Sequence, residues 1–246
     1  MNFLITNDDG IWAPGLKALA SALVEIGKVW VLAPDRERSA TGHAITVHKP
    51  LRPEKVNLNV GEEAAWHLNG TPADCVKLAL EVLLPQAPSW VCSGINSGSS
   101  LGTDVLYSGT VSAAVEGTIY NLPSLAISLL EGTADFSHAA SFAKDFLQSF
   151  KEQPPEPTLI NVNVPAGSPE ETQVTTLGVR RYCNVFQKRT DPRGKEYFWM
   201  AGDRVDCTDD PLSDIVAVQE GKISITPLTF QLTDQNMRQK LINMGW

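Results

Sequence analysis

The stretch Ile5-Thr6-Asn7-Asp8-Asp9-Gly10 ends an apolar run with two adjacent carboxylates and a glycine. Residues 2–6 are short, β-rich and bounded by turn residues, which predicts a buried parallel strand. Open α/β sheets bind their ligands in the crevice outside the carboxyl ends of the strands. Two carboxylates placed there repel each other unless a cation or a set of donors compensates them. We therefore interpret Asp8 and Asp9 as half of a divalent-metal site, the alternative being that one of them caps the following helix.

Length, charge and cysteine content narrow the class of protein. The chain has 246 residues, enough for one large α/β domain with a sizeable core. Its net charge of −8 argues against a nucleic-acid polymer or a membrane as the main partner, because both favour a basic surface. The amino terminus enters a strand without a signal-peptide pattern, and no apolar run reaches the roughly 20 residues of a membrane span. The four cysteines lack metal-ligand spacing, so we expect a cytoplasmic protein whose thiols stay reduced.

Strand and helix patterns alternate along the first two thirds of the chain, which predicts a mostly parallel sheet. The helix at residues 15–26 has apolar residues at helical spacing between Pro14 and Gly27. Two short alternating runs, residues 44–48 and 64–68, are expected to form an antiparallel addition to the sheet. Further strands are expected at residues 28–32, 124–130 and 158–164, with a helix at residues 136–150.

A second polar segment, after the one at Asp8 and Asp9, follows a strand that begins at Trp90. We expect both segments to lie on the rim of the sheet, at the carboxyl ends of its strands. The strand leads into a loop of glycines and serines that contains Asn96 and ends near Gly102. A helix opens after Tyr107-Ser108-Gly109-Thr110, so its free N–H groups and dipole would point into the same crevice as the two carboxylates. A phosphate would fit there. The alternative is an ordinary glycine-rich connection with a serine or threonine cap.

The polar side chains at this rim are oxygen donors. Asp8, Asp9, the hydroxyl of Ser39 and the amide of Asn96 form the set that a hard cation such as Mg²⁺ or Mn²⁺ prefers. A bound ion of this kind activates water and polarises a phosphoryl group. The four residues are therefore consistent with a site for phosphomonoester hydrolysis. Asn96 could instead hold a tight turn, and Ser39 could be an ordinary loop serine. His43 is either a general acid for the leaving oxygen or a structural histidine.

The pattern changes from about Gly167. Residues 184–190 and 196–201 flank Asp191-Pro192-Arg193-Gly194, which is typical of a β-hairpin. Phe198 and Trp199 would be exposed on an isolated hairpin, so we expect this arm to pack against a second subunit. A late strand at residues 223–227 and a terminal helix at residues 234–244 complete the chain. The fold class is thus α/β, with a catalytic core over residues 1–166 and a C-terminal segment over residues 167–246.

Six motifs stand in order along the chain: Asn7-Asp8-Asp9-Gly10, Pro34-Asp35-Arg36 through Ser39, Gly70-Thr71-Pro72-Ala73-Asp74-Cys75, Ser93-Gly94-Ile95-Asn96, Tyr107-Ser108-Gly109-Thr110-Val111 and Asp191-Pro192-Arg193-Gly194. Together they resemble the SurE family of survival proteins, which are metal-dependent 5′/3′-nucleotidases. The match runs from residue 2 to about residue 230. The resemblance implies a Rossmann-like three-layer αβα core and a homodimer formed by exchange of C-terminal segments, with further association into a tetramer as an alternative.

The resemblance also implies roles for individual residues. One divalent ion per subunit would be held by Asp8, Asp9, Ser39 and Asn96, with Asp8 and Asp9 catalytic. The phosphate would be surrounded by Ser39, Gly98, Ser99, Ser100, Gly109, Thr110 and Val111. Ser100 stands where many members have asparagine, so a hydroxyl replaces an amide there. The implied substrates are nucleoside 5′-monophosphates, often 3′-monophosphates and, in some members, short polyphosphate.

Three other functions use similar parts. A dinucleotide-dependent oxidoreductase should have Gly-x-Gly-x-x-Gly in its first turn, where this chain has two carboxylates that would repel a pyrophosphate. An aspartyl-phosphate phosphatase usually has Asp-x-Asp, whereas these carboxylates are adjacent. A non-catalytic sensor would bind metal and nucleotide without turnover, and a phosphate-release assay separates it from an enzyme.

Overall fold

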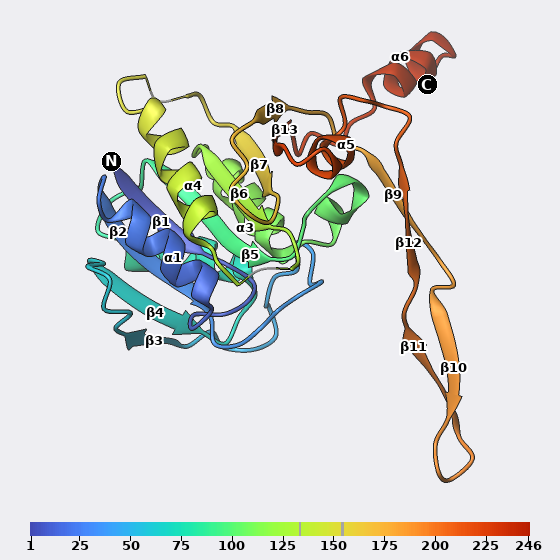
Figure 1. The fold of residues 1–246 in the computed structure, drawn as a ribbon, viewed down its shortest axis with the longest axis horizontal. Coiled ribbons are helices and arrows are strands. Elements are labelled where there is room, and N and C mark those ends of the chain that lie inside the picture. The colour runs from blue at the N-terminus through green and yellow to red at the C-terminus, as the bar shows by residue number, and fades with distance from the viewer. Residues whose placement is uncertain (133, 154) are drawn as a thin grey trace.

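A nine-stranded sheet forms the centre of the molecule (Figure 1). The computed structural model describes residues 1–132, 134–153 and 155–246. The strand order is β3-β4-β2-β1-β5-β6-β7-β13-β8, which places β1 and its carboxylate motif well inside the sheet. These strands have the following bounds: β1 Asn2–Thr6, β2 Lys28–Pro34, β3 Pro53–Val56, β4 Ala64–Leu68, β5 Trp90–Ser97, β6 Ser124–Leu129, β7 Leu159–Val164, β8 Thr172–Val174 and β13 Ile223–Leu228.

Neighbouring strands from β4 to β7 are all parallel, which confirms the predicted sheet. β3 is antiparallel to β4 on one side, and β13 is antiparallel to β7 on the other. Because parallel strands end at the same edge, the residues that follow β1, β2 and β5 meet there. The sheet therefore brings the two polar rims of the sequence together.

One part of the sheet prediction is wrong. Residues 64–68 form β4, but this strand runs parallel to β2, and its antiparallel neighbour is β3. Residues 44–48 do not form a strand. They are tied instead to the start of the next helix, where the Thr46 N–H donates to Asp74 Oδ1 over 2.9 Å and Thr71 Oγ1 donates to the Ala44 carbonyl over 2.7 Å.

Helices cover both faces of the sheet, as a three-layer αβα core requires. They have the following bounds: α1 Pro14–Leu23, α2 Pro72–Leu78 with a π-helical turn η1 Ala79–Leu83, the 3₁₀ turn η2 Gly102–Leu106, α3 Gly109–Ile119, α4 Ser137–Ser149, α5 Asp214–Gln219 and α6 Gln235–Asn243. α1 and α4 pack together on one face, and α2 and α3 on the other. α1 ends three residues before the predicted boundary.

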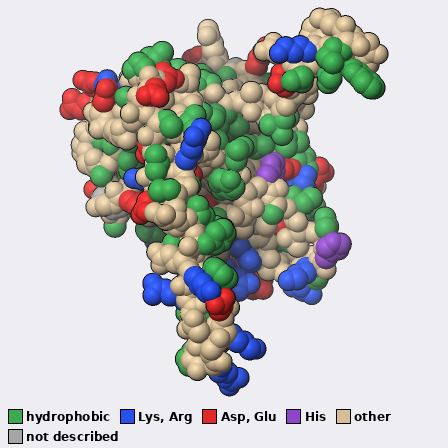
Figure 2. All heavy atoms as spheres, turned by 90° about the vertical axis from the view of Figure 1, so that its right-hand side faces the viewer, with side chains coloured by type: hydrophobic (Ala, Val, Ile, Leu, Met, Phe, Trp, Pro, Cys, Tyr) green, Lys and Arg blue, Asp and Glu red, His purple; other side chains and the backbone are tan. Residues whose placement is uncertain are grey.

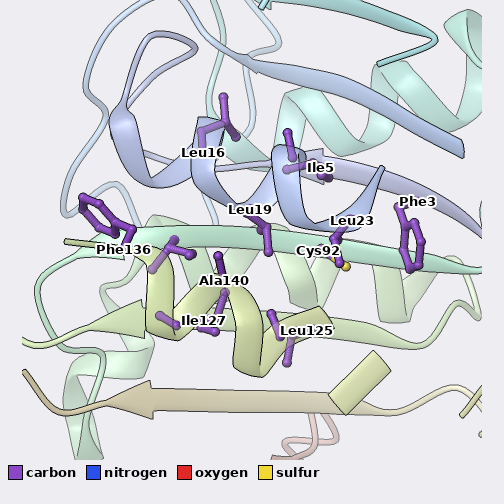
Figure 3. Close-up of a cluster of buried hydrophobic side chains, with 14 of the residues drawn as sticks. Phe3, Ile5, Leu16, Leu19, Leu23, Cys92, Leu125, Ile127, Phe136 and Ala140 are labelled. Atoms are coloured by element: carbon purple, nitrogen blue, oxygen red, sulfur yellow. The ribbon is translucent and has the colours of Figure 1, made fainter. Parts of the chain in front are cut away.

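The buried face of α1 shows why its sequence forms a helix in this place. Leu16, Leu19 and Leu23 are fully buried and point at the sheet beside α4 (Figure 3). Burial of each such side chain contributes about 1.5–3 kcal/mol. Cys92 of β5 lies in the same cluster, in agreement with a core role for that thiol. This packing fixes β1 and β5, and with them the loops that follow.

The C-terminal segment adds β8 to the sheet, leaves it to form four strands, and then returns to it as β13. β13 lies between β7 and β8, while β9 (Val179–Cys183) pairs with β12 (Asp203–Cys207). The predicted hairpin is confirmed as β10 (Phe186–Thr190) and β11 (Glu196–Met200). Together these four strands form an arm that projects from the core (Figure 1) and carries basic side chains (Figure 2). Among the described helices, none is long and apolar enough to cross a membrane.

Candidate active site

A cavity of about 280 Å³ lies at the carboxyl edge of the sheet. Of the predicted site residues, it brings together Asp8, Ser39, Asn96, Gly98, Ser99 and Ser100. Further lining residues come from the loop before α3 (Asp104, Tyr107 and Ser108), from the segment after β6 (Glu131) and from the arm (Arg180, Tyr182 and Arg204). Residues from both the predicted core and the predicted C-terminal segment therefore build one site.

Asp8 is the most enclosed of the predicted ligands, with 4% of its surface exposed. Thr110 Oγ1 donates to its Oδ1, and the Arg38 N–H donates to its carbonyl over 2.7 Å. Burial raises the pKa of Asp8 above its ordinary value, while the Thr110 hydroxyl and the N–H groups of Thr110 and Gly109 act in the opposite direction. The amino end of α3 thus holds and orients this carboxylate.

Asp9 turns to the other side of the β1 terminus. Its Oδ2 accepts a hydrogen bond of 3.0 Å from the Ser97 N–H, and it lines a neighbouring hollow together with Glu37. Burial raises the pKa of Asp9 to about 6, with smaller contributions from Asp8 and Glu37 and an opposing one from Ser97. Burial therefore disfavours the ionised form of both carboxyl groups, and for Asp9 the neighbouring carboxylates add to this effect.

Asn7, the residue before the two carboxylates, holds the turn that follows β1. Its Nδ2 donates to the Gly10 carbonyl over 3.0 Å, and its Oδ1 accepts from the Gly10 N–H over 3.1 Å. Asn7 is fully buried, so this pair of bonds closes the turn from inside the protein. The turn presents Asp8 and Asp9 on either side of the strand end.

Asn96 and Ser39 supply the remaining predicted oxygen donors. The pairing of β5 with β6 is irregular between Ser93 and Asn96, and the Gly94–Ile95 peptide bond within it is cis. Asn96 Nδ2 donates to the Gly98 carbonyl over 2.8 Å, so its Oδ1 is the atom available to a cation. Ser39 is exposed, and its hydroxyl donates to Glu37 Oε1 over 2.7 Å.

The glycine and serine loop is fixed through Ser100. Its N–H donates to Asn163 Oδ1 over 2.8 Å, and its carbonyl accepts from Nδ2 of both Asn161 and Asn163. Its hydroxyl lies 3.1 Å from Ser108 Oγ and 3.2 Å from Ser128 Oγ. The polar side chains that interrupt β6 and β7 thus have a specific partner, and they hold Gly98 and Ser99 beside the cavity.

Three of the predicted phosphate residues lie behind the cavity wall. Gly109, Thr110 and Val111 are buried at the start of α3. The Val111 N–H donates to Ser108 Oγ over 3.1 Å, and Thr110 faces Asp8. In this structure they support Asp8 and the helix start, whereas Gly98, Ser99 and Ser100 reach the cavity.

His43 bonds to a buried carboxylate rather than lining the cavity. Its Nε2 lies 2.7 Å from Glu116 Oε2, and Lys77 Nζ lies 2.7 Å from Glu116 Oε1. Burial alone would raise the pKa of Glu116, but these two partners outweigh it and hold that pKa below its ordinary value. The contact favours the structural interpretation of His43, as an anchor for the loop that carries Ser39.

Several lining residues escaped the sequence prediction. Arg180 and Tyr182 lie on β9 and Arg204 on β12, in the predicted C-terminal segment but outside the hairpin predicted at residues 184–201. The one available signal was the spacing of Arg180 and Tyr182, because alternate residues of a strand share a face. Nothing local indicates that this face would turn toward residues near Ser99.

The donor set fits a divalent cation. Asp8, Ser39 and Asn96 line the cavity, and Asp9 lines the adjoining hollow, so these residues offer two carboxyl groups, a hydroxyl and an amide oxygen. No group of three or more His, Cys, Asp or Glu side chains among the described residues could hold an ion. This agrees with the expected site, because only two of its four ligands, Asp8 and Asp9, are residues of those types. The other two expected ligands are Ser39 and Asn96.

Comparison with known proteins identifies the family. The family model described as "Survival protein SurE" matches residues 3–184. A 5′-nucleotidase SurE from Pelotomaculum thermopropionicum is 52% identical over 243 residues, which cover 98% of this chain and 94% of that protein. The chain belongs to the SurE family. Another SurE protein of the same description, from Gloeobacter violaceus, is 54% identical over 240 residues, covering 95% and 91% of the two chains.

The SurE fold is also found among solved structures. A crystal structure of the SurE protein from Aquifex aeolicus superposes with a TM-score of 0.85 at 36% identity, and the match covers 99% of both chains. The arm and the terminal helix are therefore included in the likeness. The resemblance inferred from six motifs is confirmed along the whole chain.

Proposed function

We propose that this SurE-family chain is a metal-dependent phosphomonoesterase that hydrolyses nucleoside 5′-monophosphates, and also 3′-monophosphates, to nucleoside and phosphate. The observation that carries the proposal is the shared cavity of Asp8, Asn96 and the loop at Gly98–Ser100, at the carboxyl edge of a parallel sheet. Relatives about half identical in sequence are described as 5′-nucleotidases.

Asp8, Asp9, Ser39 and Asn96 would hold one Mg²⁺ or Mn²⁺ ion per subunit, since all four offer oxygen atoms. When bound, such an ion lowers the pKa of water and neutralises phosphate charge, which enables hydrolysis with water as the nucleophile. The two carboxylates bring roughly the charge that a divalent ion needs. Thr110 keeps Asp8 in one orientation through its hydroxyl.

The chain's own groups would bind and orient the phosphate. Gly98, Ser99 and Ser100 place backbone and hydroxyl donors on the cavity wall. The amino end of α3 lies directly behind Asp8 and adds the positive end of its dipole. Ser100 supports this wall because it is fixed from both β6 and β7.

The arm supports a homodimer as part of the proposal. Phe198 and Trp199 of β11 are 59% and 63% exposed, and the apolar residues of α6, Met237, Leu241 and Ile242, are 50%, 43% and 45% exposed. Exposed apolar side chains on a projecting arm are typical of surfaces that another chain covers. A second copy of this chain is the partner that we propose.

Phosphate release from a panel of 5′-nucleotides, 3′-nucleotides and sugar phosphates tests the function. The protein is first stripped with a chelator, and Mg²⁺, Mn²⁺, Zn²⁺ or Ca²⁺ is then added back. We expect turnover only with added metal and fastest on nucleotides. Nucleotide binding without phosphate release under any metal would contradict the enzyme and identify a sensor.

A further inference from the structure

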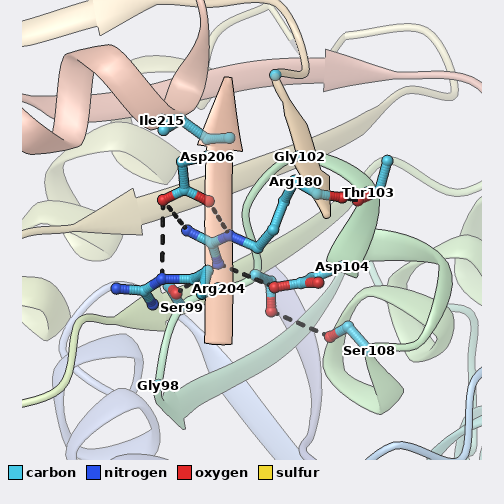
Figure 4. A network of polar contacts seen from close by, with 12 residues as sticks. Gly98, Ser99, Gly102, Thr103, Asp104, Ser108, Arg180, Arg204, Asp206 and Ile215 are labelled. Atoms are coloured by element: carbon cyan, nitrogen blue, oxygen red, sulfur yellow. Dashed lines mark hydrogen bonds and ion pairs between the residues drawn. The ribbon is translucent and has the colours of Figure 1, made fainter. Parts of the chain in front are cut away.

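Arg180 lies where the base of the arm meets the loop that carries Ser99 and Ser100. Its side chain is only 3% exposed. Nη1 lies 2.9 Å from Asp104 Oδ2 in that loop, and Nε lies 2.6 Å from Asp206 Oδ1 on the paired strand β12 (Figure 4). A second bond of 3.1 Å joins Nη2 to Asp206 Oδ2, and Nη1 lies 3.5 Å from Ser99 Oγ.

Two carboxylates, those of Asp206 and Asp104, hold the Arg180 guanidinium in its charged form. Burial opposes its charge, but Asp206 and Asp104 outweigh that effect and raise the pKa of Arg180 above its ordinary value. Its planar group makes a two-point contact with Asp206 and still directs a donor to Asp104, a geometry that lysine cannot reproduce. Arg180 therefore fixes the distance between the arm and the loop.

Asp104 connects Arg180 to the start of α3, which contacts Asp8. Its carbonyl accepts hydrogen bonds from the N–H groups of Tyr107 (2.9 Å) and Ser108 (3.0 Å). Ser108 then caps α3 through the Val111 N–H. The first residues of α3 hold Asp8, so an unbroken series of contacts runs from Arg180 to the proposed metal ligand.

Further contacts clamp the same loop against the start of β9. Thr103 Oγ1 donates to the Arg180 carbonyl. The N–H groups of Gly102 and Gly178 each donate over 2.8 Å to one oxygen of Asp214, which is fully buried. The backbones approach so closely that a Cβ on Gly102 would lie 2.8 Å from the Gly178 carbonyl oxygen. The loop has little freedom once these bonds are made.

We propose that Arg180 is a positioning residue for phosphomonoester hydrolysis. By joining Asp104 to Asp206 it holds the loop at Ser99 and the start of α3 in the arrangement that the reaction needs. The C-terminal arm thereby becomes a structural part of the active site. This inference rests on the proposed function.

The variant Arg180→Met tests the inference, with Arg181→Met as its matched control. Arg181 is the next residue on β9 and is exposed, so its replacement removes the same charge without touching the loop. We expect Arg180→Met to lower kcat about 100-fold, the size of effect that follows a misplacement near 1 Å. The KM and the affinity for Mn²⁺, measured by direct binding, should change less than threefold, because Asp8 and Asp9 remain. Arg181→Met should keep the wild-type kcat.

A double-mutant cycle with Asp104→Asn separates positioning from general support of the fold. If Arg180 acts through Asp104, the double variant loses little more kcat than either single variant. Should Arg180→Met fail to fold, Arg180→Lys decides: it retains the charge but not the two-point contact, and we expect at least a tenfold loss of kcat. A lower melting temperature with wild-type kcat in Arg180→Lys or Arg180→Met would overturn the inference. Absence of turnover in the wild-type protein would instead overturn the proposed function.

Discussion

Gly109→Ala probes the contact between α3 and Asp8. A Cβ on Gly109 would lie 2.8 Å from Asp8 Cβ and 2.9 Å from Asp8 Oδ2, whereas ordinary contacts begin near 3.4 Å. One of the two groups must therefore move by about 0.6 Å, since a packed interior has no room to spare. A displacement of this size at a reacting centre costs between about 10- and 100-fold in rate. We expect kcat for a 5′-nucleotide to fall by that factor.

Stability should respond differently from activity. Alanine favours a helix over glycine by about 1 kcal/mol, which offsets part of the steric cost, so the melting temperature of Gly109→Ala should change little. Gly61→Ala is the control, because Gly61 has φ of +96° and nothing nearer to an added Cβ than 4.0 Å. It should lower stability by about 1–2 kcal/mol through backbone strain and leave kcat unchanged. Wild-type kcat in Gly109→Ala would refute the role given to the α3 terminus.

Three further predictions concern Asp8, Glu116 and the arm. Asp8→Asn should abolish metal-dependent phosphate release without lowering the melting temperature at neutral pH, because burial already disfavours the Asp8 charge; activity at saturating metal would contradict the ligand assignment. Glu116→Gln should lower the free energy of unfolding, measured in urea at pH 7, by about 2 kcal/mol. Because the folded pKa of Glu116 lies below 4.5, that difference should persist down to about pH 4.5 and close only at lower pH; a difference that does not depend on pH would contradict the ion pair. The double substitution Phe198→Ser with Trp199→Ser should convert a dimer to monomers in sedimentation experiments, and an unchanged mass would exclude the arm from the interface.

Local patterns predicted the parallel core because each of its elements has its own periodicity. The apolar spacing of Leu16, Leu19 and Leu23 is a property of α1 alone, and the structure buries that face. Residues 44–48 alternate like a strand but form none, because Asp74 and Thr71 bind their backbone. The position of β13 between β7 and β8 depends on sheet order, which local patterns do not specify.

The candidate site likewise has residues that local patterns predicted and residues that only tertiary contacts bring together. Asp8 follows β1 and Asn96 lies at the carboxyl end of β5, so the parallel topology alone predicts that they meet. Arg180 was missed because its partner Asp104 is 76 residues away in the chain, and only the folded arm brings the two together. The split orientation of Asp8 and Asp9 likewise depends on tertiary neighbours, namely Thr110 on one side and Ser97 on the other.

A Mn²⁺ titration of the chelator-stripped protein tests the central claim most directly. Bound Mn²⁺ and phosphate release from a 5′-nucleotide are measured on the same samples. A metal-dependent nucleotidase requires that activity rise with occupancy and saturate at one ion per chain, and that Asp8→Asn lose both. Full turnover in the stripped protein, or saturated Mn²⁺ binding without phosphate release, would contradict the account.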